Sequence, residues 1–401
     1  RVHPAFPVPD GYHLCGLTHL TIRTVSMSLL LDRLQAQLSS ARGADDRSVL
    51  TARISGYLAR IGRFEEAGSL IDALRAEFSD GRNGRASAWL MWAEALLHYY
   101  SDLNPRALDR IARSQLLATA LSDSQLAALS SAWKAHMEFE ISRFRAMGES
   151  LKVAVKHVTP DNQSAITRLC MVVADALLLT GDFVNGQRWF MHGRDSALFE
   201  GDQASIEALV YNRAAFRLAW LRAQRCLGEA LPVDAASLRH EIQSARNLQD
   251  LTQVRALTDV VKLCEARAAT LDGLYDVAVE KLSAIRVASG TFAPYNFSDA
   301  LVSLEIAYCQ SRLGAIEQAK SIVDSLEGVD FNELDKDEQL VAAWMRREMA
   351  ATDSCLGSLE RTSEKFAVAA AGYREWLESI RQSVDDLRAL EPPRPSDLAD
   401  R

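Results

Sequence analysis

The sequence predicts an all-α fold, a right-handed α-solenoid of about eight antiparallel helix hairpins with a long C-terminal capping helix. Proline placement is the first observation behind this prediction, because proline is excluded from helix interiors. Of the ten prolines, those between the two chain ends all stand at expected turns; they are Pro105, Pro160, Pro232 and Pro294. The second observation is that no stretch between them alternates apolar and polar residues with the period of two that a half-buried strand requires.

The N-terminal stretch of residues 1–26 is expected to lie outside the fold, as a disordered extension. It carries three prolines, and it lacks both the basic start with an apolar core and the small-residue cleavage site of a secretory signal. The first helix is expected to begin at Met27 and to end near Gly43, with one apolar face made of Leu30, Leu31, Leu34 and Leu38.

The stretch from Ala52 to Leu74 contains the unit that the rest of the chain repeats, two amphipathic helices joined at Gly62 with almost no loop. Small side chains at Ser55 and Ala67 are expected to let the two helices approach closely. The space between the helices is expected to be filled by Leu58 and Phe64, and a neighbouring pair is expected to pack on Ile71 and Leu74.

The turn of this unit recurs about every 40 residues. Clear copies have a glycine at Gly181, Gly273 and Gly314, and Asp102 and Ser142 occupy equivalent places. The long interval between Gly181 and Gly273 is expected to hold one further hairpin, with its turn near Gly228 and a longer loop through Pro232. A final pair is expected to turn near Gly357. Residues 27–390 are therefore expected to form a single domain.

Residues 359–390 are expected to form one long helix, followed by a disordered polar tail over residues 391–401. The helix has a heptad seam of Phe366, Ala370, Tyr373, Leu377, Ile380, Val384 and Leu387. This seam can cap the last hairpin of the array, since the end of a solenoid must be covered. Alternatively, it can form a coiled coil with a second copy of the chain, which would make a homodimer.

The Gly62 turn resembles the tetratricopeptide repeat, whose consensus has a glycine, an aromatic residue two positions later and an alanine three positions further on. Here these residues are Gly62, Phe64 and Ala67. The period near 40 is longer than the 34 residues of the standard repeat. The resemblance implies a right-handed superhelix in which the first helix of each pair lines a concave groove that binds a protein or a peptide.

In this resemblance, positions about ten, six and three residues before each turn face the groove. They give an aromatic half with Trp92, Tyr99, His136, Phe139 and Asp175, and a cationic half with Arg222, Arg225, Arg267 and Tyr308. A peptide with an apolar and an acidic part would suit such a groove, because aromatic and arginine side chains are common binding anchors. The alternative is that the aromatic residues are ordinary core and that the arginines are solvated or paired with glutamates.

Composition excludes some classes of partner. With 45 Lys and Arg against 53 Asp and Glu, the formal net charge is −8, which disfavours nucleic acid. The best apolar run, Leu169 to Thr180, is interrupted by Asp175 and is too short for a membrane span. The six cysteines form no Cys-x-x-Cys pair, which indicates a reducing compartment, so a cytoplasmic location is expected.

No motif predicts catalysis, a metal or a cofactor. The run that starts at His240 and Glu241 resembles a zinc protease motif, but its fifth residue is Ser244, so the second zinc ligand is missing. The acidic stretch from Val329 to Gln339 is expected to be a solvated loop. The sequence therefore predicts a scaffold without enzymatic activity. The alternatives are a regulatory sensor arm that binds a small ligand or signalling peptide and controls a partner effector, and a solenoid that supports an unfamiliar active site.

Overall fold

The computed structural model describes residues 28–78, 83–102, 106–230, 235–252, 258–288, 298–388 and 390–392. The prediction for residues 1–26 and most of the predicted tail 391–401 lie outside these residues, as do Pro105, Pro232 and Pro294. Every regular element in the described part of the chain is helical, so the all-α prediction is confirmed there.

The helices follow one another with short connections. They are α1 (Leu29–Ser40), α2 (Ala44–Arg60), α3 (Phe64–Glu77), α4 (Gly84–Asp102), α5 (Arg106–Ala120), α6 (Ser124–Glu140), α7 (Phe144–His157), α8 (Gln163–Leu179), α9 (Phe183–Glu200), α10 (Gln203–Leu227), α11 (Ala235–Thr252), α12 (Thr258–Leu271), α13 (Tyr275–Ala288), α14 (Asp299–Arg312), α15 (Ile316–Ser325), α16 (Lys336–Thr352), the short 3-10 helix η2 (Ser354–Leu356) and α17 (Leu359–Arg388).

The tight turns within helix pairs depend on a left-handed backbone conformation, which glycine adopts without steric cost. Gly62 between α2 and α3 has φ 80°, and the same region is used at Gly181, Gly228, Gly273 and Gly314. At the equivalent place between α6 and α7, Ser142 has φ 56°. The shape of the turn is therefore kept where the sequence replaces glycine by serine.

The first hairpin shows how closely the helices pack. Ser55 of α2 and Ala67 of α3 are fully buried, and the Ser55 hydroxyl donates a hydrogen bond of 2.9 Å to the Ala67 carbonyl, as their small size led us to expect. Leu58, Ile71 and Leu74 are buried as well. The prediction for Phe64 is wrong. It is the first residue of α3 and is 36% exposed, so it lies at the edge of the pair and does not fill its centre.

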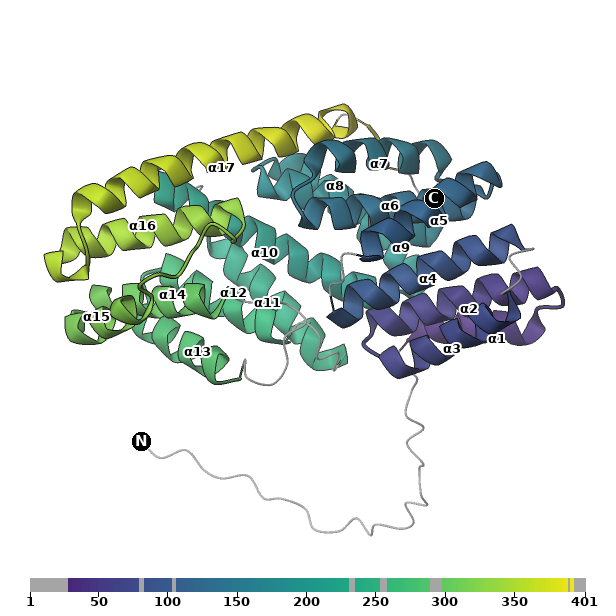
Figure 1. The fold of residues 1–401 in the computed structure, drawn as a ribbon, viewed down its shortest axis with the longest axis horizontal. Helices are drawn as coiled ribbons and strands as arrows, with labels where there is room; N and C mark the ends of the chain where they lie inside the picture. The colour runs from purple at the N-terminus through teal and green to yellow at the C-terminus, as the bar shows by residue number, and fades with distance from the viewer. Residues whose placement is uncertain are drawn as a thin grey trace, which may run out of the picture.

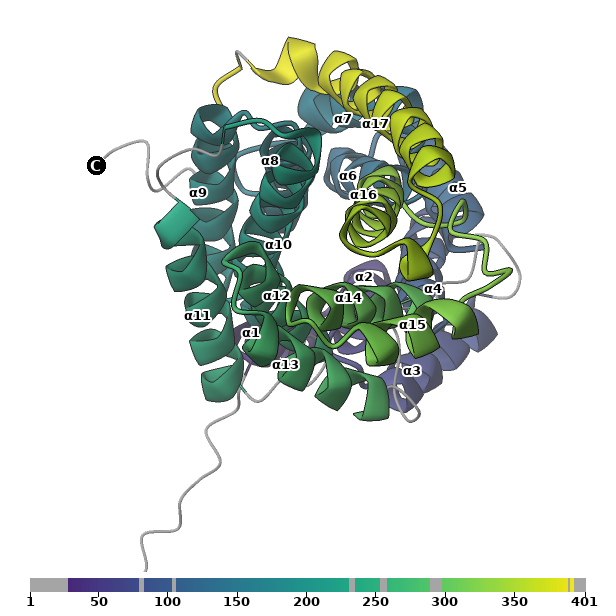
Figure 2. The ribbon, with the colours of Figure 1, turned by 90° about the vertical axis from the view of Figure 1, so that its left-hand side faces the viewer.

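The helices are arranged as a curved double layer (Figures 1 and 2). Figure 2 shows α6, α8, α10, α12, α14 and α16 on the inner side of a ring and α7, α9, α11, α13 and α15 on its outer side. Neighbouring inner helices pack on each other, for example α2 on α4, α6 on α8 and α14 on α16. In addition, α16 packs on α10, so the curvature brings the last pair back to the middle of the chain.

The first helix also returns to the middle of the chain. The backbone N–H of Leu30 in α1 donates a hydrogen bond of 3.1 Å to the Gly201 carbonyl, between α9 and α10. Beside it, the Arg33 guanidinium donates to the carbonyls of Phe199 and Glu200, at 2.8 and 2.9 Å. These acceptors are the last carbonyls of α9, which a cation stabilises. The N-terminal helix is therefore fixed to the end of α9.

The long helix α17 packs on α7, α8 and α16. Its seam residues from Ala370 to Leu387 are buried, and Phe366 is partly buried. The approach to α7 is close, since a Cβ atom at Gly148 would lie 2.6 Å from the carbonyl oxygen of Ser383. The seam that could have joined two chains is therefore occupied within one chain.

The hairpin α8–α9 contacts both the first and the last helix, since α1 is bonded to the end of α9 and α17 packs on α8. Almost every residue of α8 is buried, including the apolar run from Leu169 that stood out in the sequence.

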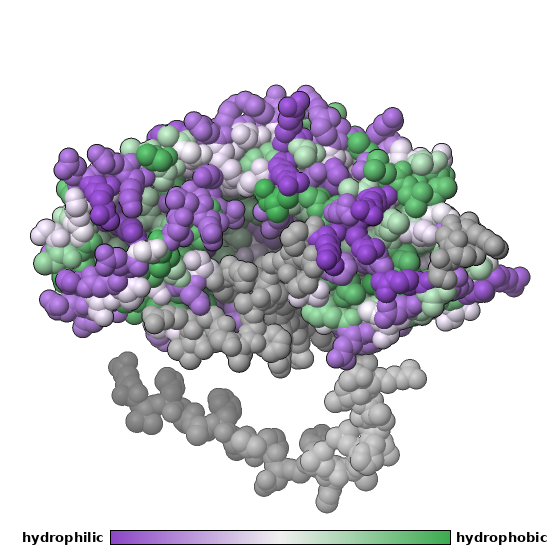
Figure 3. All heavy atoms as spheres, viewed as in Figure 1, coloured by the Kyte–Doolittle hydropathy of each residue, from purple (hydrophilic) through white to green (hydrophobic). Residues whose placement is uncertain are grey.

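The face drawn in Figure 3 mixes hydrophilic and hydrophobic side chains. Within the described residues, no helix combines the length and the apolarity that a membrane span needs.

Candidate functional site

The structure brings two of the predicted groove residues into contact. The hydroxyl of Tyr99 on α4 lies 3.0 Å from Nε2 of His136 on α6, and the two rings meet edge to face. His136 is buried, and this burial, together with the nearby Arg168, holds its pKa well below the usual value. His136 is therefore neutral at physiological pH. Trp92, two turns before Tyr99 on the same helix, is buried against Trp89 and against α2 at Gly56.

The other two residues of the predicted aromatic half belong to the core. Phe139 is buried between Phe144 and Phe216, with ring centroids 6.0 and 5.7 Å away. Asp175 is 2% exposed and accepts a hydrogen bond of 2.8 Å from Asn212. Burial raises the pKa of Asp175 well above its usual value. The prediction that these two side chains face a partner is wrong, because helices α7 and α10 cover them.

The predicted cationic half converges on one place. Arg222 and Arg225 of α10, Arg267 of α12 and Tyr308 of α14 all line a small cavity of about 20 Å³. The sequence register therefore placed these four residues together correctly.

Their charge is not free, however. Glu305 of α14 accepts hydrogen bonds from Arg222 at 2.6 Å and from Arg267 at 3.0 Å, and Glu338 of α16 accepts a third from Arg267 at 3.1 Å. Burial of Glu305 opposes its ionisation, but the two guanidinium groups hold the pKa of its carboxyl below the usual value. The prediction of a cationic surface is corrected on this point, because these arginines bind carboxylates of α14 and α16 that lie 38 to 83 positions further along the chain. Arg225 remains exposed, and its guanidinium donates to the Leu271 carbonyl.

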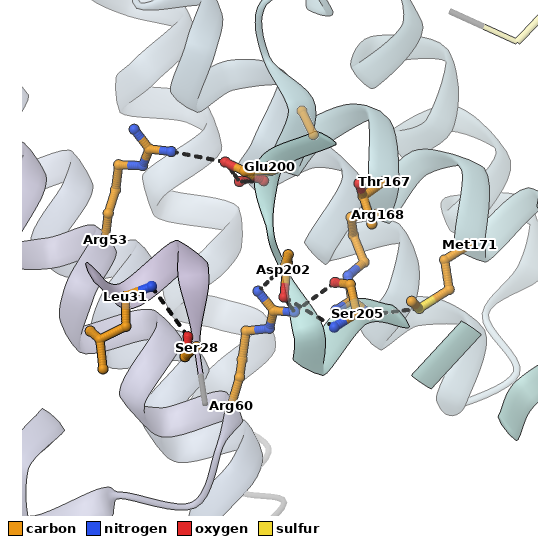
Figure 4. Close-up of polar contacts among 12 residues, drawn as sticks. Ser28, Leu31, Arg53, Arg60, Thr167, Arg168, Met171, Glu200, Asp202 and Ser205 are labelled. Carbon is orange, nitrogen blue, oxygen red and sulfur yellow. Dashed lines mark hydrogen bonds and ion pairs between the residues drawn. The ribbon is translucent and has the colours of Figure 1, made fainter. Parts of the chain in front are cut away.

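A second polar cluster on the inner side joins the first helices to the middle of the chain (Figure 4). The Arg60 guanidinium at the end of α2 donates two hydrogen bonds of 2.9 Å to Asp202, and a third of 2.6 Å to the Ser205 hydroxyl. Beside it, Glu200 accepts hydrogen bonds from Arg53 at 3.2 Å and from the Ser164 hydroxyl at 2.7 Å. These residues were not predicted, because nothing in the local sequence relates positions so far apart.

A groove of about 600 Å³ lies between α16 and α17. Its apolar part has small side chains, which leave room for another chain: Ala342 and Ala343 on α16, and Ala369 and Gly372 on α17. The loop before α16 contributes the ring of Phe331. Val368, which is 74% exposed, stands on the α17 side. In Figure 1 these two helices run side by side at the upper edge of the molecule.

Four cationic side chains also line this groove: Lys336, Arg346, Arg361 and Lys365. Among the described residues, none of them has a carboxylate within ion-pair distance, although Asp330 and Glu364 belong to the same lining. The Arg346 guanidinium lies over the Phe331 ring, 4.8 Å from its centroid, and its Nε is buried without a hydrogen-bond partner. Burial and the neighbouring Arg361 lower the pKa of Arg346. The sequence suggested only a solvated acidic loop here, because the cations come from two helices and meet only in the folded chain.

The described part of the chain has no group of three or more His, Cys, Asp or Glu side chains that could hold a metal ion. No protein-family model matches the chain. A search of curated proteins finds no match either. The groove between α16 and α17, which we call the α16–α17 groove, combines room for another chain with cations that lack carboxylate partners among the described residues.

Proposed function

We propose that this chain is a tetratricopeptide-like helical-hairpin solenoid that acts as a protein- or peptide-binding scaffold. The order of helix contacts supports the solenoid, since each even-numbered helix from α2 to α16 packs on the odd-numbered helix that follows it. The Gly62 turn, with Phe64 and Ala67, fits the same proposal. Helix pairs that stack in this way form extended surfaces, and such surfaces are used to bind other molecules.

The proposed binding surface is the α16–α17 groove, and not the inner residues that the sequence favoured. Most of the inner residues are buried or bonded to one another. The observation that carries the proposal is the set of groove cations without carboxylate partners. A buried donor such as Nε of Arg346 costs free energy while it has no acceptor, and an anionic group of a ligand would supply one.

The shape of the groove favours a peptide segment with acidic and apolar side chains. At 1.5 Å per helical residue, the stretch from Lys336 to Arg346 is about 15 Å long, and about four or five extended residues would span it. The small residues of the lining let a backbone approach closely, and Phe331 and Val368 offer apolar contact. Carboxylates of the segment would meet Arg346, Arg361 and Lys365.

A steric block of the groove tests this function. A Cβ atom at Gly372 would meet no atom within 4 Å, so Gly372→Leu is expected to leave the helix intact while its side chain fills the groove. The probes are fluorescein-labelled peptides in which glutamates alternate with apolar residues. By fluorescence anisotropy, the variant should bind them at least about tenfold more weakly than wild type, a loss of about 1.4 kcal/mol.

The matched control is Gly68→Leu in α3, because a Cβ atom there also meets no atom within 4 Å and the residue lies far from the groove in the sequence. This control should bind the peptides like wild type. Peptides in which lysine replaces glutamate should bind neither protein. Equal affinity of Gly372→Leu and wild type would contradict the assignment of the groove.

A further inference from the structure

A small cavity of about 20 Å³ lies on the inner side of the ring, where α2 and α4 meet α8 and the start of α10. The polar residues that matter here are Arg53, Arg60, Trp92, Arg168 and Asp202, all of which line it. Figure 4 shows Arg60 and Arg168 approaching the same region from opposite sides. A cavity needs about 10 to 15 Å³ to hold one water molecule, so this one has room for a single small particle.

Three buried hydrogen-bond donors of this lining have no partner among the described residues, and one of them is the hydroxyl of Tyr57 on α2. Nε of Arg60 and Nε1 of Trp92 are both buried without a hydrogen-bond partner. Neither atom can accept a hydrogen bond, so they cannot satisfy each other. A buried donor without an acceptor is costly, and it indicates that something absent from the protein chain occupies the site.

A further donor group, the Arg168 guanidinium, is 3% exposed. Its Cζ atom lies 3.6 Å from the centroid of the Trp133 ring, and its Nη1 donates a hydrogen bond to the sulfur of Met171, a weak acceptor. Within the described residues, no carboxylate lies within ion-pair distance of this group. Among the described residues, its positive charge is therefore not compensated by a direct ion pair.

The other charges around the cavity are already paired. Arg53 binds Glu200, and both terminal nitrogens of Arg60 bind the two oxygens of Asp202 at 2.9 Å. The carboxylates therefore do not neutralise Arg168, and the lining keeps an excess of one positive charge. An acceptor with a negative charge fits this balance better than a neutral water molecule.

We propose that this cavity binds one small monovalent anion of the size of chloride, held by Trp92, Arg60 and Arg168. The volume excludes a carboxylic acid or a phosphate ester, and the lining offers N–H donors where a cation would need oxygen ligands. The ion would join α2 and α4 to α8 beside the Arg60–Asp202 pair. It would therefore stabilise the contact between the first hairpins and the middle of the chain.

Chloride-dependent unfolding tests the proposal. The melting temperature is measured in sodium chloride and in sodium gluconate at the same ionic strength, for wild type and for Trp92→Phe, which keeps an aromatic ring but removes the N–H group. The control is Trp376→Phe. It removes the same kind of N–H group at the surface, where Nε1 of Trp376 donates a hydrogen bond to the Ser142 hydroxyl. The increase in melting temperature from gluconate to chloride should be about 1 to 3 °C larger for wild type and for the control than for Trp92→Phe.

Line broadening of the chloride-35 NMR signal gives a second readout on the folded proteins. Wild type should broaden the signal, bromide should compete, and Trp92→Phe should broaden it less. A chloride increment that is the same in all three proteins would reflect general salt effects and would overturn the proposal. Absence of broadening by wild type would overturn it as well. If Trp92→Phe does not fold, the broadening by wild type and its competition by bromide decide alone.

Discussion

Arg60 and Asp202, which lie 142 positions apart in the chain, form a bidentate ion pair with two hydrogen bonds of 2.9 Å. Asp202 is buried, and it also accepts a hydrogen bond from the backbone N–H of Ser205, so it caps the N-terminus of α10. Burial opposes the ionisation of Asp202, yet the Arg60 guanidinium keeps the pKa of its carboxyl below the usual value. The Asp202 carboxylate therefore caps α10 and also holds the end of α2 against it.

Removal of this carboxylate should be strongly destabilising. Asp202→Ala leaves the Arg60 charge buried without its partner and removes the helix cap, so the free energy of unfolding should fall by about 3 to 5 kcal/mol. Urea unfolding followed by circular dichroism measures it. The double variant Arg60→Met with Asp202→Ala should recover part of the loss, because no unpaired charge then remains.

An exposed ion pair provides the comparison. Arg63 and Glu66 are also hydrogen bonded, but their side chains are 44% and 55% exposed. Glu66→Ala should therefore leave the free energy of unfolding almost unchanged, because solvent screens an exposed ion pair. A loss at Asp202 as small as the loss at Glu66 would show that the closure between α2 and α10 contributes little to stability.

Gly56 on α2 is a second place where the packing is specific. A Cβ atom there would lie 2.4 Å from the ring of Trp92, so Gly56→Ala should lower the free energy of unfolding by about 1 to 3 kcal/mol through overpacking. Gly68 on α3 has open space, so Gly68→Ala should raise it by about 0.5 to 1 kcal/mol. Chemical unfolding of the two variants compares them directly, and equal effects would contradict the close contact of α2 with α4.

Asp175 predicts a pH dependence. Burial raises its pKa in the folded protein, so above the ordinary value near 4 the folded state holds a proton that the unfolded state releases. This residue therefore makes the protein less stable as pH rises from about 4 toward the raised pKa. Asp175→Asn removes the effect and still accepts the hydrogen bond from Asn212. Its stability relative to wild type should increase between pH 4 and pH 8, and a pH-independent difference would contradict this.

Thiol reactivity tests the packing of the inner and outer layers. Cys170, Cys226, Cys264 and Cys309 are buried, while Cys355 is exposed. Burial raises the pKa of Cys264 to about 11 and that of Cys226 to about 12, so little reactive thiolate forms at neutral pH. Of these five cysteines, only Cys355 should be modified rapidly by a thiol reagent in the folded protein. Mass spectrometry can map which cysteines the reagent has modified, before and after addition of urea.

The helices and the turns could be predicted from the sequence because their causes are local. Turn residues such as Gly62 and Ser142 take a left-handed conformation, and proline placement and helical periodicity mark where helices begin and end. The register was good enough to bring Arg222 and Arg267 to one cavity. Contacts inside one hairpin, such as Ser55 with Ala67, followed from side-chain size.

Contacts between distant helices could not be predicted, because they depend on the curvature of the whole array. Glu305 reaches Arg222 across 83 positions, and this distant pairing removed the free charge that the groove prediction needed. Likewise, nothing in the sequence relates Arg346 to Arg361. The two side chains line one groove only because α16 and α17 pack side by side. Periodicity indicates which face of a helix is apolar, but it does not identify the helix that covers this face.

The most direct measurement on the central claim is the affinity of the acidic peptides for a protein whose groove charges are removed. Arg346→Gln combined with Arg361→Gln is compared by isothermal titration with Arg145→Gln combined with Arg374→Gln, two exposed arginines outside the groove. The groove variant should lose about tenfold or more in affinity, because charge-assisted hydrogen bonds contribute about 1.5 to 3 kcal/mol each. The control variant should bind like wild type. Equal binding by both double variants, or no binding by wild type, would contradict the central claim.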